Sequence, residues 1–152
     1  MGVEIERKFL VTGAAWRSGT GVRLTQGYLN RDKARTVRVR VAGEQSWLTI
    51  KGVSTGATRA EFEYPIPLAD AQAMLLLCDG TLIDKTRHTV DVGGTVWEVD
   101  VFHGDNAGLV VAEVELTTED QPFERPAWLG DEVTHDPRYF NSALIALPYS
   151  QW

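Results

Sequence analysis

Residues 83–102 read IDKTRHTVDVGGTVWEVDVF, a glycine pair flanked on both sides by alternating polar and apolar residues. Side chains in a strand alternate between its two faces, so residues two apart share a face. The favoured two-residue hairpin turn needs positive φ at both central positions, which Gly93 and Gly94 adopt without steric strain. A hairpin closed by these glycines places Arg87 opposite Asp100, so cations and carboxylates share one surface.

Charged residues recur two apart along the rest of the chain, with apolar residues between them. The sets are Glu4, Glu6 and Lys8; Arg38 and Arg40; Glu61 and Glu63; Lys85 and Arg87; Glu98 and Asp100; Glu113 and Glu115. Adjacent like charges repel unless a counter-charge or a bound ion lies between them. The pattern therefore predicts a sheet with one strongly ionic face turned into a cavity. A purely structural domain with a wet outer face is the alternative.

Strand patterns separated by glycine-rich or polar breaks dominate the chain, and eight strands can close into a barrel. We expect strands at 3–11, 22–30, 36–42, 46–52, 60–66, 83–92, 95–102 and 109–117. Helical patterns interrupt them at 68–78 and 138–146, with a shorter one near 13–18. The predicted fold is therefore mostly β within the α+β class, in a single domain spanning residues 1–152.

Composition and charge exclude several classes of protein. The formal net charge of -6 argues against a nucleic-acid binder, which normally carries a net basic charge. Cys78 is the only cysteine, so an internal disulfide is excluded. No segment approaches the ~20 apolar residues of a membrane span, and none resembles a signal peptide. We expect a cytoplasmic protein with neither a membrane nor a nucleic acid as partner.

The ionic residues have the chemistry of a metal and phosphate site. Carboxylates drawn from several strands supply the oxygen ligands that hard divalent ions such as Mg²⁺ and Mn²⁺ prefer, whereas zinc favours Cys and His. Arginine forks and lysine ammonium groups bind phosphate oxygens. Because the chain has neither a Walker loop nor a dinucleotide fingerprint, side chains would have to hold the phosphates.

With these residues laid out, the chain resembles the CYTH superfamily, the triphosphate tunnel metalloenzymes, and most closely its short bacterial tripolyphosphatase-like branch. The family's Glu-x-Glu-x-Lys signature appears as Glu4-Ile5-Glu6-Arg7-Lys8. Further motifs follow in order: Gln26-Gly27-Tyr28-Leu29, Arg38-Val39-Arg40, Leu48-Thr49-Ile50-Lys51, Glu61-Phe62-Glu63, Lys85-Thr86-Arg87, Glu98-Val99-Asp100, Glu113-Val114-Glu115 and Arg138-Tyr139-Phe140-Asn141. The resemblance implies an eight-stranded antiparallel closed β-barrel, a tunnel that admits a linear triphosphate and hydrolyses it with a divalent metal.

The resemblance also implies roles for single residues. The implied metal ligands are Glu4, Glu6, Asp100, Glu113 and Glu115, with Glu61 and Glu63 as candidate ligands of a second ion. The implied phosphate ligands are Lys8, Arg38, Arg40, Lys51, Lys85 and Arg87. Two schemes for activating the attacking water stay open. In one, Tyr28 is the base because the Lys51 ammonium lowers the pKa of its phenol; in the other, a second metal activates its own water.

The expected reaction is Mg²⁺-dependent hydrolysis of inorganic tripolyphosphate to pyrophosphate and phosphate, with Mn²⁺ as a substitute ion. Thiamine triphosphate or another organic triphosphate is the alternative substrate, and adenylate cyclase is a more distant alternative. A polyphosphate or nucleotide sensor without turnover is the non-enzymatic alternative. The sequence leaves the number of metal ions and the oligomeric state open.

Overall fold

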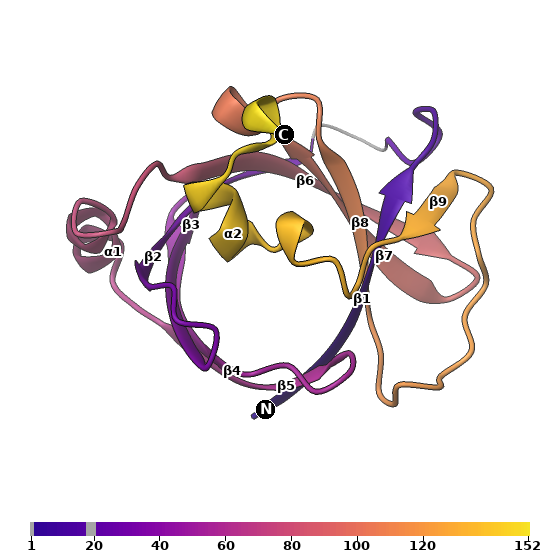
Figure 1. The fold of residues 1–152 in the computed structure, drawn as a ribbon, viewed down its shortest axis with the longest axis horizontal. Helices are drawn as coiled ribbons and strands as arrows, with labels where there is room; N and C mark the ends of the chain where they lie inside the picture. Colours follow the sequence, from indigo (N-terminus) through magenta and orange to yellow (C-terminus); the bar gives the residue numbers. More distant parts are fainter. Residues whose placement is uncertain (1, 18–20) are drawn as a thin grey trace.

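A computed structural model describes residues 2–17 and 21–152, and its main feature is a ring of antiparallel strands (Figure 1). The strands are β1 (Val3–Val11), β2 (Val22–Asn30), β3 (Arg35–Ala42), β4 (Gln45–Gly52), β5 (Thr58–Pro65), β6 (Ile83–Val92), β7 (Thr95–Phe102), β8 (Val110–Glu115) and β9 (Leu129–Glu132). The helices are α1 (Leu68–Leu75) and α2 (Asn141–Ala146), with 3-10 turns η1 (Gly104–Asn106), η2 (Pro137–Tyr139) and η3 (Tyr149–Gln151).

The sheet closes on itself through its first strand. Neighbours follow the order β5-β4-β3-β2-β6-β7-β8-β1-β9, and β5 also pairs with β1, where Val3 lies opposite Ala60. The eight-stranded antiparallel barrel is therefore confirmed. The short strand β9 was not predicted; it pairs with β1 at Phe9 and Val11, beyond the point where the barrel closes.

The glycine-centred hairpin also forms as predicted. Gly93 and Gly94 have φ of 59° and 84°, and β6 pairs with β7 in the expected register, with Arg87 opposite Asp100. Since register decides which face each side chain takes, this turn directs Lys85, Arg87, Glu98 and Asp100 to the inner face of the barrel.

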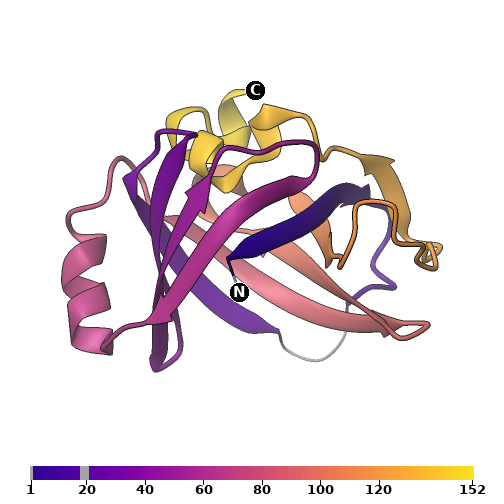
Figure 2. The ribbon, with the colours of Figure 1, turned by 90° about the horizontal axis from the view of Figure 1, so that it is seen from below.

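Much of the apolar core lies outside the barrel wall. One cluster contains Phe9, Trp16, Trp97, Val99, Ala112, Val114, Leu116 and Trp128. Trp97 is fully buried, and its ring packs edge-on against Phe9, Phe123 and Trp128 at centroid distances of 5.6, 5.5 and 5.7 Å. Helix α1 packs on the outside of β2, β3 and β4 (Figure 2). Because packing stabilises the outer faces, the inner faces are left for charged side chains.

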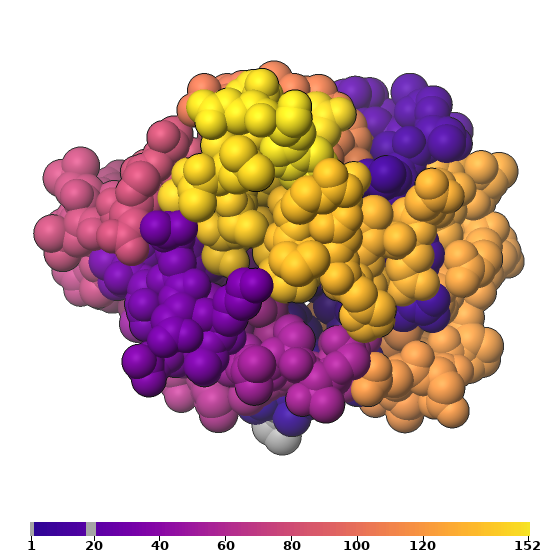
Figure 3. Space-filling view, viewed as in Figure 1, coloured from indigo at the N-terminus to yellow at the C-terminus, as the bar shows by residue number. Residues whose placement is uncertain are grey.

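A second apolar cluster closes part of one barrel end. Residues 133–147, here called the plug, carry Val133, Tyr139 and Leu144 against residues at the ends of β6, β7 and β8, namely Ile83, Phe102 and Val111. The plug crosses the opening of the ring in Figure 1, and its yellow and orange atoms cover part of that opening in Figure 3.

The helices differ in detail from the predicted ranges. Helix α1 ends at Leu75 rather than at residue 78 and continues as tight turns. The segment 138–146 is divided at Phe140, whose backbone is extended (φ -69°, ψ 133°), into η2 and α2. Residues 13–16 form a bend and turn rather than a helix, and residue 18 lies outside the described residues. In the described part of the chain, every helix is too short or too polar to cross a bilayer.

Candidate active site

The barrel encloses a polar cavity of about 260 Å³. Its lining residues are Glu4, Glu6, Lys8, Tyr28, Thr36, Arg38, Arg40, Lys51, Arg59, Glu61, Glu63, Lys85, Arg87, Glu98, Glu113, Glu115, Phe140, Asn141 and Ser142. The structure thus brings together every residue predicted for the site except Asp100, which lies behind the lining. The interior contains both signs of charge, and many of them gather in two walls; Lys8 Nζ lies on the acidic side, 3.4 and 3.5 Å from Glu6 and Glu113.

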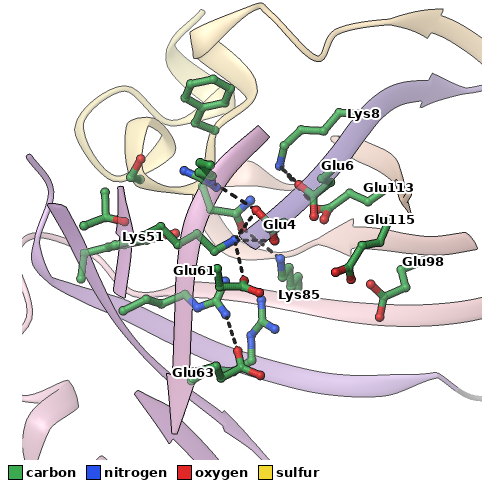
Figure 4. Close-up of a pocket in the computed structure, with 18 of the residues that line it drawn as sticks. Glu4, Glu6, Lys8, Lys51, Glu61, Glu63, Lys85, Glu98, Glu113 and Glu115 are labelled. Atoms are coloured by element: carbon green, nitrogen blue, oxygen red, sulfur yellow. Dashed lines mark hydrogen bonds and ion pairs between the residues drawn. The ribbon is translucent and has the colours of Figure 1, made fainter. Parts of the chain in front are cut away.

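One wall, from β1, β7 and β8, is crowded with carboxylates: Glu6, Glu98, Glu113 and Glu115 (Figure 4). Burial and the neighbouring charge of Glu4 raise the pKa of Glu115. Burial, with Glu113 among the neighbours, raises the pKa of Glu98 despite its 3.2 Å ion pair with Arg87. Among the described residues no cation lies within ion-pair distance of Glu115. This wall therefore carries negative charge that the protein's own cations do not fully balance.

The carboxylate wall fits a hard divalent ion in donor chemistry and charge. Glu6, Glu113 and Glu115 offer only oxygen donors, and a divalent ion would relieve the repulsion that raises the pKa of Glu115. No group of three acidic, His or Cys side chains within residues 2–17 and 21–152 is already gathered as a ligand set.

The facing wall, from β3 and β6, is crowded with cations: Arg38, Arg40, Lys85 and Arg87. Burial and the charges of Arg38 and Arg87 lower the pKa of Arg40 to about 10. Burial lowers the pKa of Lys85 to about 7, with the neighbouring charges of Arg87 and Arg40 acting in the same direction and Asp100 opposing them. The Nε atom of Arg38 is buried and has no hydrogen-bond partner among the residues that the structure describes. Such a wall is suited to a multiply charged anion.

Asp100 lies between two of these cations. Its Oδ2 is 2.8 Å from Lys85 Nζ, and its two oxygens accept hydrogen bonds of 2.8 and 2.9 Å from the Arg87 guanidinium. The side chain is completely buried, and although burial raises the pKa of Asp100, the Lys85 and Arg87 charges hold it below its usual value. The structure shows Asp100 as a buried counter-ion; its role as a metal ligand stays a prediction.

Between the walls, Glu4 is held by two cations. Lys51 Nζ lies 3.0 and 3.1 Å from the Glu4 oxygens and 3.4 Å from Glu61, while Arg59 Nε donates to Glu4 at 3.2 Å. These partners outweigh the effect of burial and lower the pKa of Glu4 to about 2. The sequence prediction omitted Arg59, although its place two residues before Glu61 on β5 assigns it to the same face.

Tyr28 and Lys51 both line the cavity, but they have different partners. Lys51 contacts Glu4 and Glu61, and no hydrogen bond in the described chain joins it to Tyr28. Their predicted joint role in water activation stays a prediction.

Three lining residues belong to the plug and were given no role by the sequence prediction: Phe140, Asn141 and Ser142. Asn141 is the first residue of α2, and its Oδ1 accepts hydrogen bonds from Lys85 Nζ (3.0 Å) and Gln26 Nε2 (3.1 Å). Arg138-Tyr139-Phe140-Asn141 was quoted above as a family motif, and that motif is the sequence signal that points to this segment.

Comparisons with known proteins agree with this geometry. Residues 2–141 match the CYTH domain family. The chain is 49% identical over 154 residues to an inorganic triphosphatase of Acetivibrio thermocellus, which covers 100% of this chain and 99% of that protein. It is 37% identical over 150 residues to an inorganic triphosphatase of Nitrosomonas europaea, covering 95% and 99% of the two chains.

Solved structures show the same relationship. The crystal structure of an inorganic triphosphatase is 36% identical, with a TM-score of 0.65 over 93% of this chain and 96% of that one. A conserved hypothetical protein from Pyrococcus furiosus shares the fold, with a TM-score of 0.59 at 16% identity over 77% and 80% of the two chains. The family match and full-length relatives, together with a closed barrel lined by the ordered charged motifs, establish that this chain belongs to the CYTH domain family.

Proposed function

We propose that this protein hydrolyses a linear triphosphate, and that the substrate is inorganic tripolyphosphate, which it converts into pyrophosphate and phosphate. The observation that carries the proposal is the pairing of two walls inside one closed barrel, crowded cations facing crowded carboxylates. The full-length relatives named inorganic triphosphatase support the same substrate.

The cation wall would bind the phosphates. Arg38, Arg40, Lys85 and Arg87, with Lys8 and Lys51, can form charge-assisted hydrogen bonds to several phosphate groups at once. Burial and, after it, repulsion between neighbouring cations lower the pKa of Arg40 and Lys85, and a polyanion would relieve that repulsion. Tyr28 and Phe140 are the only aromatic residues in the described lining, and the rest of it is polar or charged. This lining favours the inorganic substrate.

The carboxylate wall would hold the metal. Glu4, Glu6, Glu113 and Glu115 are the proposed ligands of Mg²⁺ or its substitute Mn²⁺, and Glu98 adds to the same negative wall. Glu61 and Glu63 are candidate ligands of a second ion, and Asp100 acts first as the counter-ion of Lys85 and Arg87. When bound, a divalent ion neutralises phosphate charge and lowers the pKa of its water.

In the proposed reaction, the oxygen of a water molecule forms a bond to a terminal phosphorus atom. The bond from that phosphorus to the bridging oxygen breaks, and pyrophosphate leaves with its electron pair. The arginine forks stabilise the charge that spreads over the phosphate oxygens, and the closed barrel limits bulk water. Because Lys51 is engaged by Glu4 and Glu61, the arrangement favours the scheme in which Tyr28 is not the base for the proton of the attacking water.

A phosphate-release screen with tripolyphosphate, thiamine triphosphate and ATP tests the proposal, each with Mg²⁺, Mn²⁺ or EDTA. We expect release from tripolyphosphate with either ion and none with EDTA. Faster release from thiamine triphosphate or ATP would overturn the substrate assignment. Tight tripolyphosphate binding without product under every metal condition would identify a sensor instead.

A further inference from the structure

Two side-chain amides, the buried Gln26 and the partly buried Asn141, connect the cation wall to the plug. Asn141 Oδ1 accepts from Lys85 Nζ at 3.0 Å and from Gln26 Nε2 at 3.1 Å. Gln26 Oε1 in turn accepts from Arg40 Nε at 2.8 Å. Gln26 is fully buried and Lys85 is 1% exposed, so bulk solvent has little access to these two partners. The network therefore runs from α2, across β2, to two of the proposed phosphate ligands.

Both amides are uncharged, so they can orient the cations of an anion-binding site without neutralising them. Lys85 and Arg40 are long side chains that repel one another, so they need acceptors to hold one rotamer. A carboxylate acceptor, like Asp100 on Lys85, offsets part of the positive charge that attracts phosphate. An amide oxygen orients the same cation and leaves its charge available to a substrate.

We propose that Asn141 and Gln26 are positioning residues whose amide relay sets the affinity for triphosphate by fixing Lys85 and Arg40. The inference rests on the proposed function, in which both cations bind phosphate. It assigns the plug a role in substrate binding rather than in closing the barrel alone.

Contacts other than those of Asn141 also hold the plug on the barrel, so the effect of Asn141 on the cations can be tested separately from the attachment of the plug. Leu144 and Tyr139 pack against Ile83 and Phe102. Beyond the plug, Tyr149 N donates to Asn106 Oδ1 at 2.9 Å. The plug therefore has packing contacts that do not depend on Asn141, and the Asn106 contact supplies a control far from the phosphate ligands.

Calorimetric titration with a methylene-bridged tripolyphosphate analogue and Mg²⁺ measures the effect without turnover. We expect Asn141→Leu and Gln26→Leu each to raise Kd about tenfold, because each removes an acceptor or a linking donor from a charged hydrogen-bond network. The double variant should lose no more than the worse single variant, because the two amides act as one unit. With tripolyphosphate, KM should rise more than kcat falls. The control variant Asn106→Ala should have a lower Tm and an unchanged Kd. If Asn141→Leu does not fold, Asn141→Ala takes its place.

Each outcome discriminates. Unchanged Kd in both Asn141 and Gln26 variants, or additive losses in the double variant, overturns the relay while the proposed function stands. An equal rise in Kd in Asn106→Ala overturns it as well, because plug docking alone would then explain the effect. Wild-type protein that does not bind the analogue overturns both the relay and the proposed function.

Discussion

Replacing Asp100 by Asn removes a buried charge while keeping the side-chain shape. Lys85, whose side chain is 1% exposed, would lose its charged partner, whereas Arg87 keeps Glu98 at 3.2 Å and Glu113 at 4.0 Å. Breaking a buried ion pair by removing one partner costs about 3–5 kcal/mol, and the partners retained by Arg87 favour the lower end, about 3 kcal/mol. For a chain of this size, about 2–4 °C per kcal/mol gives a fall in Tm of about 6–12 °C.

Thermal unfolding at pH 6, where Lys85 with its pKa of about 7 is still charged, measures this loss without divalent ions, with Asp84→Asn as the matched control. Asp84 also lies on the barrel and pairs with an arginine, Arg23, but that pair is solvent-exposed and should contribute little. At pH 9 the loss should be smaller, because Lys85, with a pKa of about 7, has then released its proton. A Tm for Asp100→Asn within about 2 °C of wild type at pH 6 would refute the counter-ion reasoning.

Three further predictions concern the site. Glu115→Gln should raise the Tm of the metal-free protein, because it removes a crowded carboxylate with a raised pKa, and should reduce the Tm rise caused by Mg²⁺; a lower metal-free Tm would contradict this. In wild type, the folded state releases the Lys85 proton near pH 7, whereas the unfolded chain keeps it up to about pH 10.5. Between these pH values the unfolded state binds more protons than the folded state. The free energy of unfolding should therefore increase as pH rises through this window. Denaturant unfolding from pH 7 to 9 should reveal this slope, reduced in Lys85→Met; equal slopes would contradict it. Tyr28→Phe should retain most of its kcat for tripolyphosphate, and a loss greater than about 100-fold would identify the phenol as the base.

Much of the site was readable from the sequence because strand alternation is local. Two-residue spacing assigned charged residues such as Arg38, Arg40 and Glu113 to one face, and the structure places these three around one cavity. The same rule would have included Arg59, which lies two residues before Glu61 on β5. The roles predicted for these residues in metal and phosphate binding stay predictions.

Other features depend on contacts that spacing cannot specify. Asp100 shares a face with Glu98, yet it lies behind the cavity lining because Lys85 and Arg87 occupy its oxygens. Strand β9 was not predicted because its four residues show little apolar alternation. It forms where β1 extends past the barrel and offers a partner strand.

The sequence by itself determined the strands, the hairpin at Gly93 and Gly94 and the common face of the charged residues, because backbone alternation and turn geometry act between near neighbours. Tertiary structure alone decided the pairing of β5 with β1 and the placement of Asn141 against Lys85. These contacts join residues far apart in the chain, and their geometry depends on how the whole sheet twists and closes.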